Sequence, residues 1–279
     1  QITSVSADIN GRTLTLETGR IAEQAHGAVV VRYGDSMILA TVVGEQKESS
    51  LPFFPLTVDY EERMYAAGKI PGGFIKREGR PTEHATLSAR LTDRPIRPLF
   101  PKGYKSEVQV MITVLSADQE NDPDILSIIG ASAALSISPI PWEGPVGAVR
   151  MGFVDGELVT NPVYEQVESG SLDMVIAGTD DAIMMVEGES AEVSEDTLLE
   201  AIRIAHVQIG TIVDLQRQLV EKAGKEKWSF TPPEENVELR GEIEAFLGDA
   251  LRDAVRNTDK VMRVEATGDL EQQVIDHFT

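Results

Sequence analysis

Cysteine is absent from this chain of 279 residues, which excludes a disulfide framework, a cysteine-ligated metal site and a thiol nucleophile. Long apolar runs are absent too. The longest, residues 125–142, is interrupted by Gly130, several serines and two prolines, so we expect no membrane span. The chain does not open with a basic segment followed by a short apolar core, and we therefore expect a cytoplasmic protein. Apolar residues still make up 42% of the sequence, which excludes disorder as a description of the whole chain.

Common cofactor and metal motifs are incomplete. Ala67-Gly68-Lys69 lacks the pattern of a phosphate-binding loop, because Arg63 stands where the first glycine is required and Ile70 replaces the Ser or Thr that binds magnesium. The acidic residues 118–124 lack the glycine and the closing glutamate of an EF-hand loop, and we interpret them as helix caps. No Gly-x-Ser-x-Gly elbow is present.

The histidines show no metal-ligand spacing: His26, His84, His206 and His277. His84 is interpreted as an exposed histidine on a helix. The sequence therefore predicts no metal or cofactor bound by this chain itself.

Positive charge is scarce and unevenly placed. The chain has 25 basic and 46 acidic residues, a net charge of −21, and residues 151–202 contain 13 acids and no Lys or Arg. Residues 63–105, by contrast, contain ten basic and three acidic residues, a net charge of +7. We call this segment the basic island. An anionic ligand is expected to bind there rather than on the acidic remainder of the chain, which repels phosphates.

Alternating apolar residues and turn signals predict strands in the first sixty residues. Asn10-Gly11 and Gly34-Asp35 are typical hairpin turns, and the pattern predicts a β-meander of about four strands. The segment 36–43 is apolar at nearly every position, which predicts a strand covered on both faces. The predicted strands are 12–17, 28–33, 36–43 and 54–59.

A glycine- and proline-rich segment, 67–81, predicts an exposed loop. Thr82 is the predicted N-cap of a helix that ends near Arg94, because Pro95 follows. Later predicted helices are 125–136, capped by residues 121–124, and a long one from Ser194 to about Gly224. Further strands are predicted at 108–115, 147–154, 157–160, 172–177 and 182–187.

Beyond Trp228 the pattern changes. Pro232 and Pro233 interrupt regular structure, and residues 234–278 show only amphipathic helical periodicity. The sequence therefore predicts an α+β domain followed by a small all-α domain, with a boundary at about residues 228–232.

The basic island offers the contacts that a nucleic-acid strand needs. Arginine forks match phosphate oxygens, and Phe74 presents a face on which a base can stack. On the following helix, Arg90 and Arg94 share one face, and Arg97 continues the line. The competing interpretation is that these cations pair with the protein's own acids, and the sequence leaves both open.

Several segments closely resemble the first half of bacterial polynucleotide phosphorylases: 53–74, 76–81, 90–100, 130–135 and 173–179. The resemblance covers essentially the whole chain. It implies an α+β fold in which a ribonuclease-PH-like domain of mixed sheets and packed helices, residues 1–228, precedes an all-α domain, residues 233–279, truncated at its carboxyl end. It also implies a homotrimeric ring that degrades mRNA from the 3′ end, uses inorganic phosphate as the attacking group and releases nucleoside diphosphates.

In that family the catalytic residues and the bound Mg²⁺ lie in a second ribonuclease-PH-like half, so we expect no catalytic or metal-binding residue in this chain. The family pattern places Asp173 at one metal-binding aspartate, but Val175 at the catalytic lysine and Val167 at the other aspartate, unless Glu168 substitutes. Residues 121–124 occupy the place of the phosphate-binding serines, and their carboxylates would repel phosphate. This half alone is therefore expected to be inactive.

The family's RNA-gripping loop corresponds to Phe74, Ile75, Lys76 and Arg77, with Ile75 replacing a second aromatic residue and Lys76 an arginine. The resemblance thus implies single-stranded RNA as a partner, and no membrane. The predicted RNA-binding residues are Phe74, Lys76, Arg77, Arg80, Arg90, Arg94 and Arg97. Two alternatives stay open: a nucleotide or pyrophosphoryl-transfer activity in this half itself, or a structural half whose basic island contacts other subunits.

Overall fold

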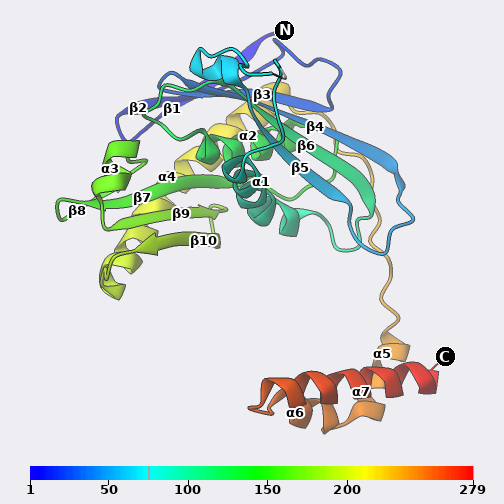
Figure 1. Ribbon diagram of the computed structural model, residues 1–279. Coiled ribbons are helices and arrows are strands. Elements are labelled where there is room, and N and C mark those ends of the chain that lie inside the picture. The colour runs from blue at the N-terminus through cyan, green and yellow to red at the C-terminus, as the bar shows by residue number, and fades with distance from the viewer. Residues whose placement is uncertain (75, 279) are drawn as a thin grey trace. The chain divides into compact units, whose positions relative to one another are not determined.

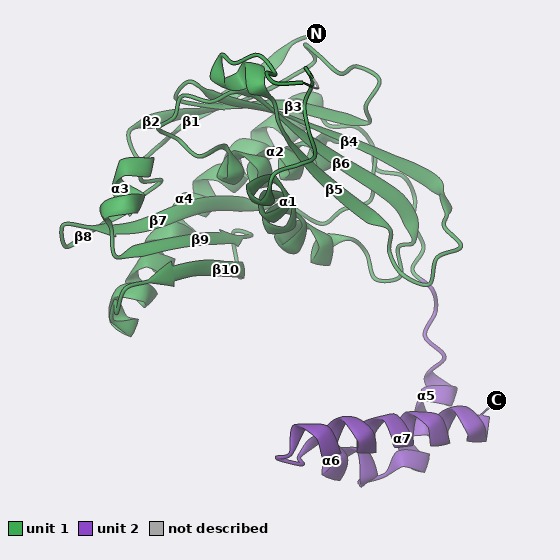
Figure 2. Cartoon of the chain, in the orientation of Figure 1, with its two compact units in different colours: residues 1–232 green, residues 233–279 purple. Residues whose placement is uncertain are grey.

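Residues 1–232 fold into two β-sheets with helices between them (Figure 1). The structure is a computed structural model that describes residues 1–74 and 76–278. It divides into two compact units, Gln1–Pro232 and Pro233–Thr279 (Figure 2). The first unit has mixed sheets and packed helices and the second is helical, which confirms the predicted fold class.

The first sheet has six strands in the order β1-β2-β3-β4-β6-β5. Strands β1 to β4 are antiparallel neighbours, and the turns at Asn10-Gly11 and Gly34-Asp35 join them as predicted. The prediction that the fourth meander strand lies at 54–59 is wrong, because β6 inserts beside β4 and β5 pairs parallel to β6 at the sheet edge. The strands are β1 Thr3–Ile9, β2 Arg12–Thr18, β3 Gly27–Tyr33, β4 Ser36–Glu48, β5 Leu56–Glu62 and β6 Ser106–Ser116.

The expectation that the strand at 36–43 is covered on both faces is wrong for β4. Its residues alternate between buried and partly exposed along Ser36 to Val42, so only one face packs against the core. Met37 and Leu39 are half-buried on the other face, and Val43 is exposed. An apolar run therefore did not distinguish a strand covered on both faces from one covered on a single face.

The second sheet has four antiparallel strands in the order β10-β9-β7-β8. Both hairpins that build it were predicted from sequence, and their strands pair in the expected way. The strands are β7 Gly147–Val154, β8 Glu157–Thr160, β9 Leu172–Gly178 and β10 Ile183–Ser190.

Helix α2, Pro123–Ile137, lies between the two sheets (Figure 1). It packs on β3 and β4 on one side and on β7 on the other, and all of its residues are buried. Ser132 donates from its hydroxyl to Gln216 Oε1 at 2.6 Å, which joins α2 to α4 inside the core. Helix α4, Glu195–Ala223, is capped by Ser194 as predicted and packs on β7 and β1.

Helix α1, Glu83–Ile96, begins at the predicted N-cap: the Thr82 hydroxyl accepts a hydrogen bond from the Ala85 amide at 3.0 Å. The predicted end at Arg94 is wrong, because Pro95 lies inside the helix. Proline removes only its own amide bond in this last turn, and the Arg97 amide still donates to the Asp93 carbonyl. The short helices η1 (Met64–Ala67), η2 (Arg97–Leu99) and α3 (Tyr164–Ser169) were not predicted.

The second unit contains helices α5 Val237–Leu247, α6 Ala250–Val255 and α7 Lys260–Phe278. Phe246 of α5 stacks on His277 of α7, with ring centroids 4.5 Å apart. No residue of this unit that the structure describes is buried, so its apolar side chains are largely exposed. Across the described residues of both units, no helix is long and apolar enough to cross a bilayer.

Gly130 tests how tightly α2 packs on the first sheet. A Cβ at this position would lie 2.8 Å from Ile38 Cδ1, 3.0 Å from Ala40 Cβ and 3.1 Å from Val31 Cγ2. We expect Gly130→Ala to lower the free energy of unfolding by about 1–3 kcal/mol in urea titrations, although alanine favours helix. The control is Gly210→Ala in α4, where nothing lies within 4 Å. That variant should gain about 0.5–1 kcal/mol, and equal effects of the two substitutions would contradict the packing argument.

Candidate functional site

The loop between η1 and α1 presents the first part of the basic island to solvent. Phe74 is fully exposed at 101% relative accessibility, and Lys76, Arg77 and Arg80 are exposed as well. Within the described residues, no ion pair or hydrogen bond engages the side chains of these three cations. Ile75, which the resemblance placed at the second aromatic position, lies outside the described residues.

The loop is anchored at its ends rather than along its length. The Met64 amide donates to Glu78 Oε1 at 3.1 Å, and the Thr82 hydroxyl donates to Glu62 Oε2 at 2.7 Å. A cleft of about 430 Å³ lies beside these contacts, and Arg63 and Arg80 are among the residues that line it. The anchored ends position the loop while its basic and aromatic side chains stay available to a ligand.

The predicted arginines of α1 and of its C-cap differ from one another. Arg94 forms an ion pair with Glu187 of β10. Arg97 pairs with Asp93 at 2.9 Å and also donates to the carbonyls of Phe54 and Leu56. Only Arg90 is exposed with no ion pair among the described residues. The alternative that the sequence left open, pairing with the protein's own acids, thus applies to Arg94 and Arg97.

A second group of charges lies inside the first unit, where α2 meets the four-stranded sheet. Arg150 of β7 places Nη2 2.7 Å from Asp124 Oδ2 and 3.5 Å from Asp122 Oδ2, and Nη1 3.4 Å from Asp173 Oδ2. The arginine side chain is only 13% exposed. We call these four residues the Arg150 cluster. Three carboxylates face one guanidinium, so the cluster has an excess of negative charge.

Three polar atoms of the Arg150 cluster are buried without a partner in the part of the chain that the structure describes. Within the described residues, the buried atoms Asp124 Oδ1, Asp173 Oδ1 and Arg150 Nε have no hydrogen-bond partner. Burial, and then the charge of Asp122, raises the pKa of Asp124 to about 7, although Arg150 acts in the opposite direction. Burial also raises the pKa of Asp173. A buried carboxylate oxygen without a hydrogen-bond partner is costly, so the electrostatic energy of this cluster is unfavourable.

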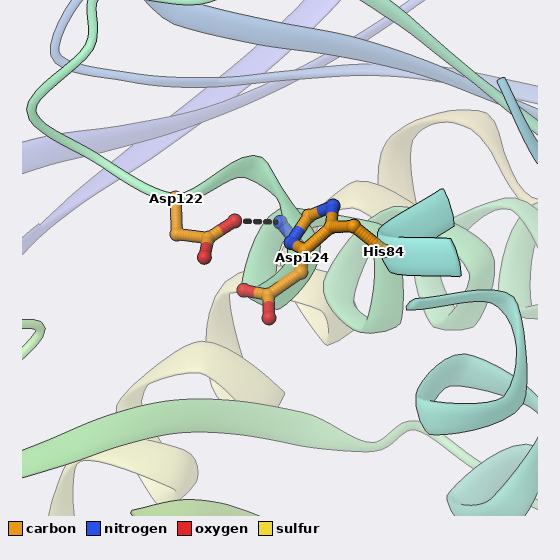
Figure 3. Close-up of side chains that lie close together, drawn as sticks. All are labelled: His84, Asp122 and Asp124. Atoms are coloured by element: carbon orange, nitrogen blue, oxygen red, sulfur yellow. Dashed lines mark hydrogen bonds between the residues drawn. The ribbon is translucent and has the colours of Figure 1, made fainter. Parts of the chain in front are cut away.

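His84 borders the same cluster. It lies in the first turn of α1, and its ligand nitrogen and one oxygen each of Asp122 and Asp124 lie within 4.8 Å of one another. Figure 3 shows the three side chains converging from the start of α1 and the start of α2. The interpretation of His84 as exposed and helical is confirmed, but its carboxylate neighbours were not foreseen.

Asp118, at the start of the segment 118–124, has a structural role. Asp118 accepts hydrogen bonds from the amides of Ser36, Glu120 and Asn121. Burial alone would raise its pKa, but the hydrogen bonds from Asn121, Glu120 and Ser36 outweigh burial and lower the pKa of Asp118 to about 2. The side chain of Asp122 accepts from the Asp124 amide and caps α2, as predicted.

Comparisons with known proteins match most of this first unit. Residues 10–141 match the model of the 3′ exoribonuclease family, domain 1, and residues 144–208 match domain 2 of the same family. The chain belongs to the 3′ exoribonuclease family. Both the exposed loop and the Arg150 cluster lie within the matched residues of this exoribonuclease-family chain.

Relatives named polyribonucleotide nucleotidyltransferase match nearly the whole chain. The protein of Thermomicrobium roseum is 63% identical over 98% of this chain, and that of Chloroflexus aggregans is 58% identical over 100%. The chain spans 35% and 37% of the length of these two relatives, corresponding to their amino-terminal part. The predicted resemblance is confirmed.

A solved structure supports the fold independently of close sequence similarity. Rice Rrp46 superimposes with a TM-score of 0.59 at 14% identity, covering 79% of this chain and 94% of that chain. At such low identity the match supports the ribonuclease-PH-like fold alone.

Sequence reasoning missed Arg150, although a signal was present. It is the only basic residue between Lys105 and Arg203, and it interrupts an apolar strand. A single cation in a buried strand indicates a buried partner, since charges are rarely buried unpaired. The identity of the partners could not be read in the same way, because Asp122, Asp124 and Asp173 come from α2 and β9.

Removing the Arg150 guanidinium should destabilise the protein. We expect Arg150→Met to lower the free energy of unfolding by about 3–5 kcal/mol, because the buried Asp124 and the partly buried Asp122 and Asp173 then remain without a cation. The measurement is urea unfolding followed by circular dichroism. The control is Arg203→Met, whose side chain is 76% exposed beside Glu200, and it should change stability by no more than about 0.5 kcal/mol. Similar losses in both variants would mean that the cluster does not stabilise the fold.

Proposed function

We propose that this chain is the RNA-binding first part of a phosphorolytic 3′-to-5′ exoribonuclease. The observation that carries the proposal is the exposed loop, where Phe74 lies beside three cations without internal partners among the described residues. A base can stack on the phenyl ring while Lys76, Arg77 and Arg80 contact backbone phosphates. Such contacts accept any base sequence, which a processive exonuclease requires.

The residues that we propose to contact RNA are fewer than the sequence alone suggested. Arg94 and Arg97 already have acidic partners, so we assign them to the protein's own structure. Arg90 is exposed on α1, the helix that also contains Arg94, and stays a secondary candidate. The principal RNA contacts that we propose are Phe74, Lys76, Arg77 and Arg80.

We infer that catalysis takes place elsewhere in the full-length protein. Val175 stands where the family pattern has its lysine, and it is 6% exposed within β9. Glu168, the carboxylate considered as a substitute for the missing aspartate, is exposed on α3. The resemblance implies that residues 121–124 correspond to the family's phosphate-binding serines, and the carboxylates of Asp122 and Asp124 in that segment would repel phosphate.

The remaining family properties are part of the same proposal. We propose that the whole protein forms a homotrimeric ring in the cytoplasm and degrades mRNA with inorganic phosphate, and that its second half binds the catalytic Mg²⁺. We also propose that residues 1–228 form the first ribonuclease-PH-like domain and 233–279 the all-α domain. The sequence similarity to polyribonucleotide nucleotidyltransferases over nearly the whole chain supports this proposal.

Charge removal in the loop should weaken RNA binding without unfolding the protein. We expect the Lys76→Ala/Arg77→Ala double variant to bind all single strands more weakly and to flatten the slope of log K against log salt by about one to two. Phe74→Ala should instead lose about 1–3 kcal/mol of binding free energy, with a nearly unchanged salt slope, because it removes stacking. Fluorescence anisotropy at several salt concentrations measures both.

A matched control replaces two exposed cations outside the basic island, Arg203 and Lys222 on α4, with alanine. It removes the same charge and should leave the salt slope close to that of the wild type. If the loop and control variants bind RNA equally well, the loop does not bind RNA, and a contact between subunits becomes the favoured role of the basic island.

The chain alone should not phosphorolyse RNA. Incubation with a single-stranded RNA, inorganic phosphate and Mg²⁺ is expected to release no nucleoside diphosphate above the no-protein control, because the family's lysine and one of its aspartates are missing. Val175→Lys alone should not restore activity, since the phosphate-binding serines would still be absent. Diphosphate release by a homogeneous preparation would instead favour an activity in this half.

A further inference from the structure

The space between His84, Asp122 and Asp124 has the donor set of a cation site. One nitrogen and two carboxylate oxygens lie within 4.8 Å of one another, and the three side chains point toward a common region (Figure 3). Two helices hold them there: His84 is in the first turn of α1, and Asp122 and Asp124 begin α2. A hydrogen bond of 2.6 Å between the hydroxyls of Thr92 and Ser127 joins these two helices.

The charges around this space are unbalanced. Three acidic side chains, those of Asp122, Asp124 and Asp173, face the single positive charge of Arg150. Arg150 forms its ion pairs with the Oδ2 atoms of Asp122 and Asp124. A divalent cation beside the same carboxylates would balance the cluster.

Two buried polar atoms point independently to a missing partner. Asp124 is only 4% exposed, its carboxylate belongs to the converging group, and its Oδ1 has no hydrogen-bond partner among the described residues. Tyr60 is 2% exposed, its hydroxyl is likewise unpartnered, and its ring centroid lies 6.4 Å from that of His84. Buried polar atoms normally have a partner, so the unpartnered Asp124 Oδ1 indicates a ligand in this space. Tyr60 adds a second buried polar atom without a partner among the described residues, the hydroxyl of a residue whose ring lies beside that of His84.

The environment of His84 matches that of a metal-binding histidine. Its Nδ1 lies 2.8 Å from Glu62 Oε1, and a second hydrogen bond from Thr82 holds the same carboxylate. Histidines that bind metals usually give their other ring N–H to a carboxylate, which fixes the ring and the tautomer. With Nδ1–H directed at Glu62, Nε2 is left as the ligand atom.

We propose that His84, Asp122 and Asp124 bind a divalent transition-metal cation, with Mn²⁺ as the representative ion. One imidazole and two carboxylates suit Mn²⁺ better than Mg²⁺, because Mg²⁺ favours ligand sets made of oxygen alone. The site links the first turns of α1 and α2, and its His84 shares the Glu62 carboxylate with the anchored end of the loop proposed to bind RNA. It neither requires nor supplies phosphorolysis by this chain.

The test is a Mn²⁺ titration of the purified 279-residue chain, followed by electron paramagnetic resonance. We expect one saturable site per chain, with coupling to an imidazole nitrogen in the spin-echo modulation spectrum. His84→Gln should abolish that nitrogen coupling and weaken Mn²⁺ binding about tenfold or more. Asp122→Asn keeps the cap of α2 and should weaken binding to a similar extent.

Glu120→Gln is the matched control, because Glu120 is a neighbouring carboxylate with a side chain 68% exposed and lies outside the converging group. It should bind Mn²⁺ as the wild type does. Circular dichroism and thermal unfolding in the presence of a chelator verify that all three variants fold. Absence of saturable binding, or equal Mn²⁺ affinity in His84→Gln and Glu120→Gln, would overturn the proposal whether or not the loop binds RNA.

Discussion

The burial of α2 between the two sheets is the constraint on which the rest of the first unit depends. Every residue of this helix is buried, and its glycine allows close approach to β3 and β4. Because the helix also contacts β7 and α1, its position fixes the distance between the two sheets and brings the start of α1 to the start of α2. The Arg150 cluster and the neighbouring His84 exist as a group because of this packing.

The two candidate sites differ in how the fold holds them. The loop with Phe74 lies outside the core, is anchored only near its ends, and presents side chains that a flexible ligand can reach. The Arg150 cluster is held by helices and strands, so its charges cannot move apart to relieve repulsion. A surface loop suits a polymer that must slide, whereas a rigid buried group of ligands suits a small ion.

Membership in the 3′ exoribonuclease family says more about the fold of this chain than about its activity. Rice Rrp46 shares the fold at only 14% identity, which shows how far sequences diverge on this architecture. The proposal that catalysis takes place elsewhere in the full-length protein rests on particular side chains of this chain and not on its fold. A fold can be retained while one copy of a site takes on another role, since function depends on particular side chains.

The sequence by itself determined the features that depend on neighbouring residues. The hairpin turns, the N-caps Thr82 and Ser194, the exposed glycine-rich loop and the composition of the basic island are all local. Tertiary structure decided what depends on distant segments: β5 beside β6, Pro95 within α1, the acidic partner of Arg94, and the convergence of His84 with Asp124. Turns and caps arise from hydrogen bonds within a few residues, whereas these pairings join residues far apart in the chain, and periodicity contains no information about such contacts.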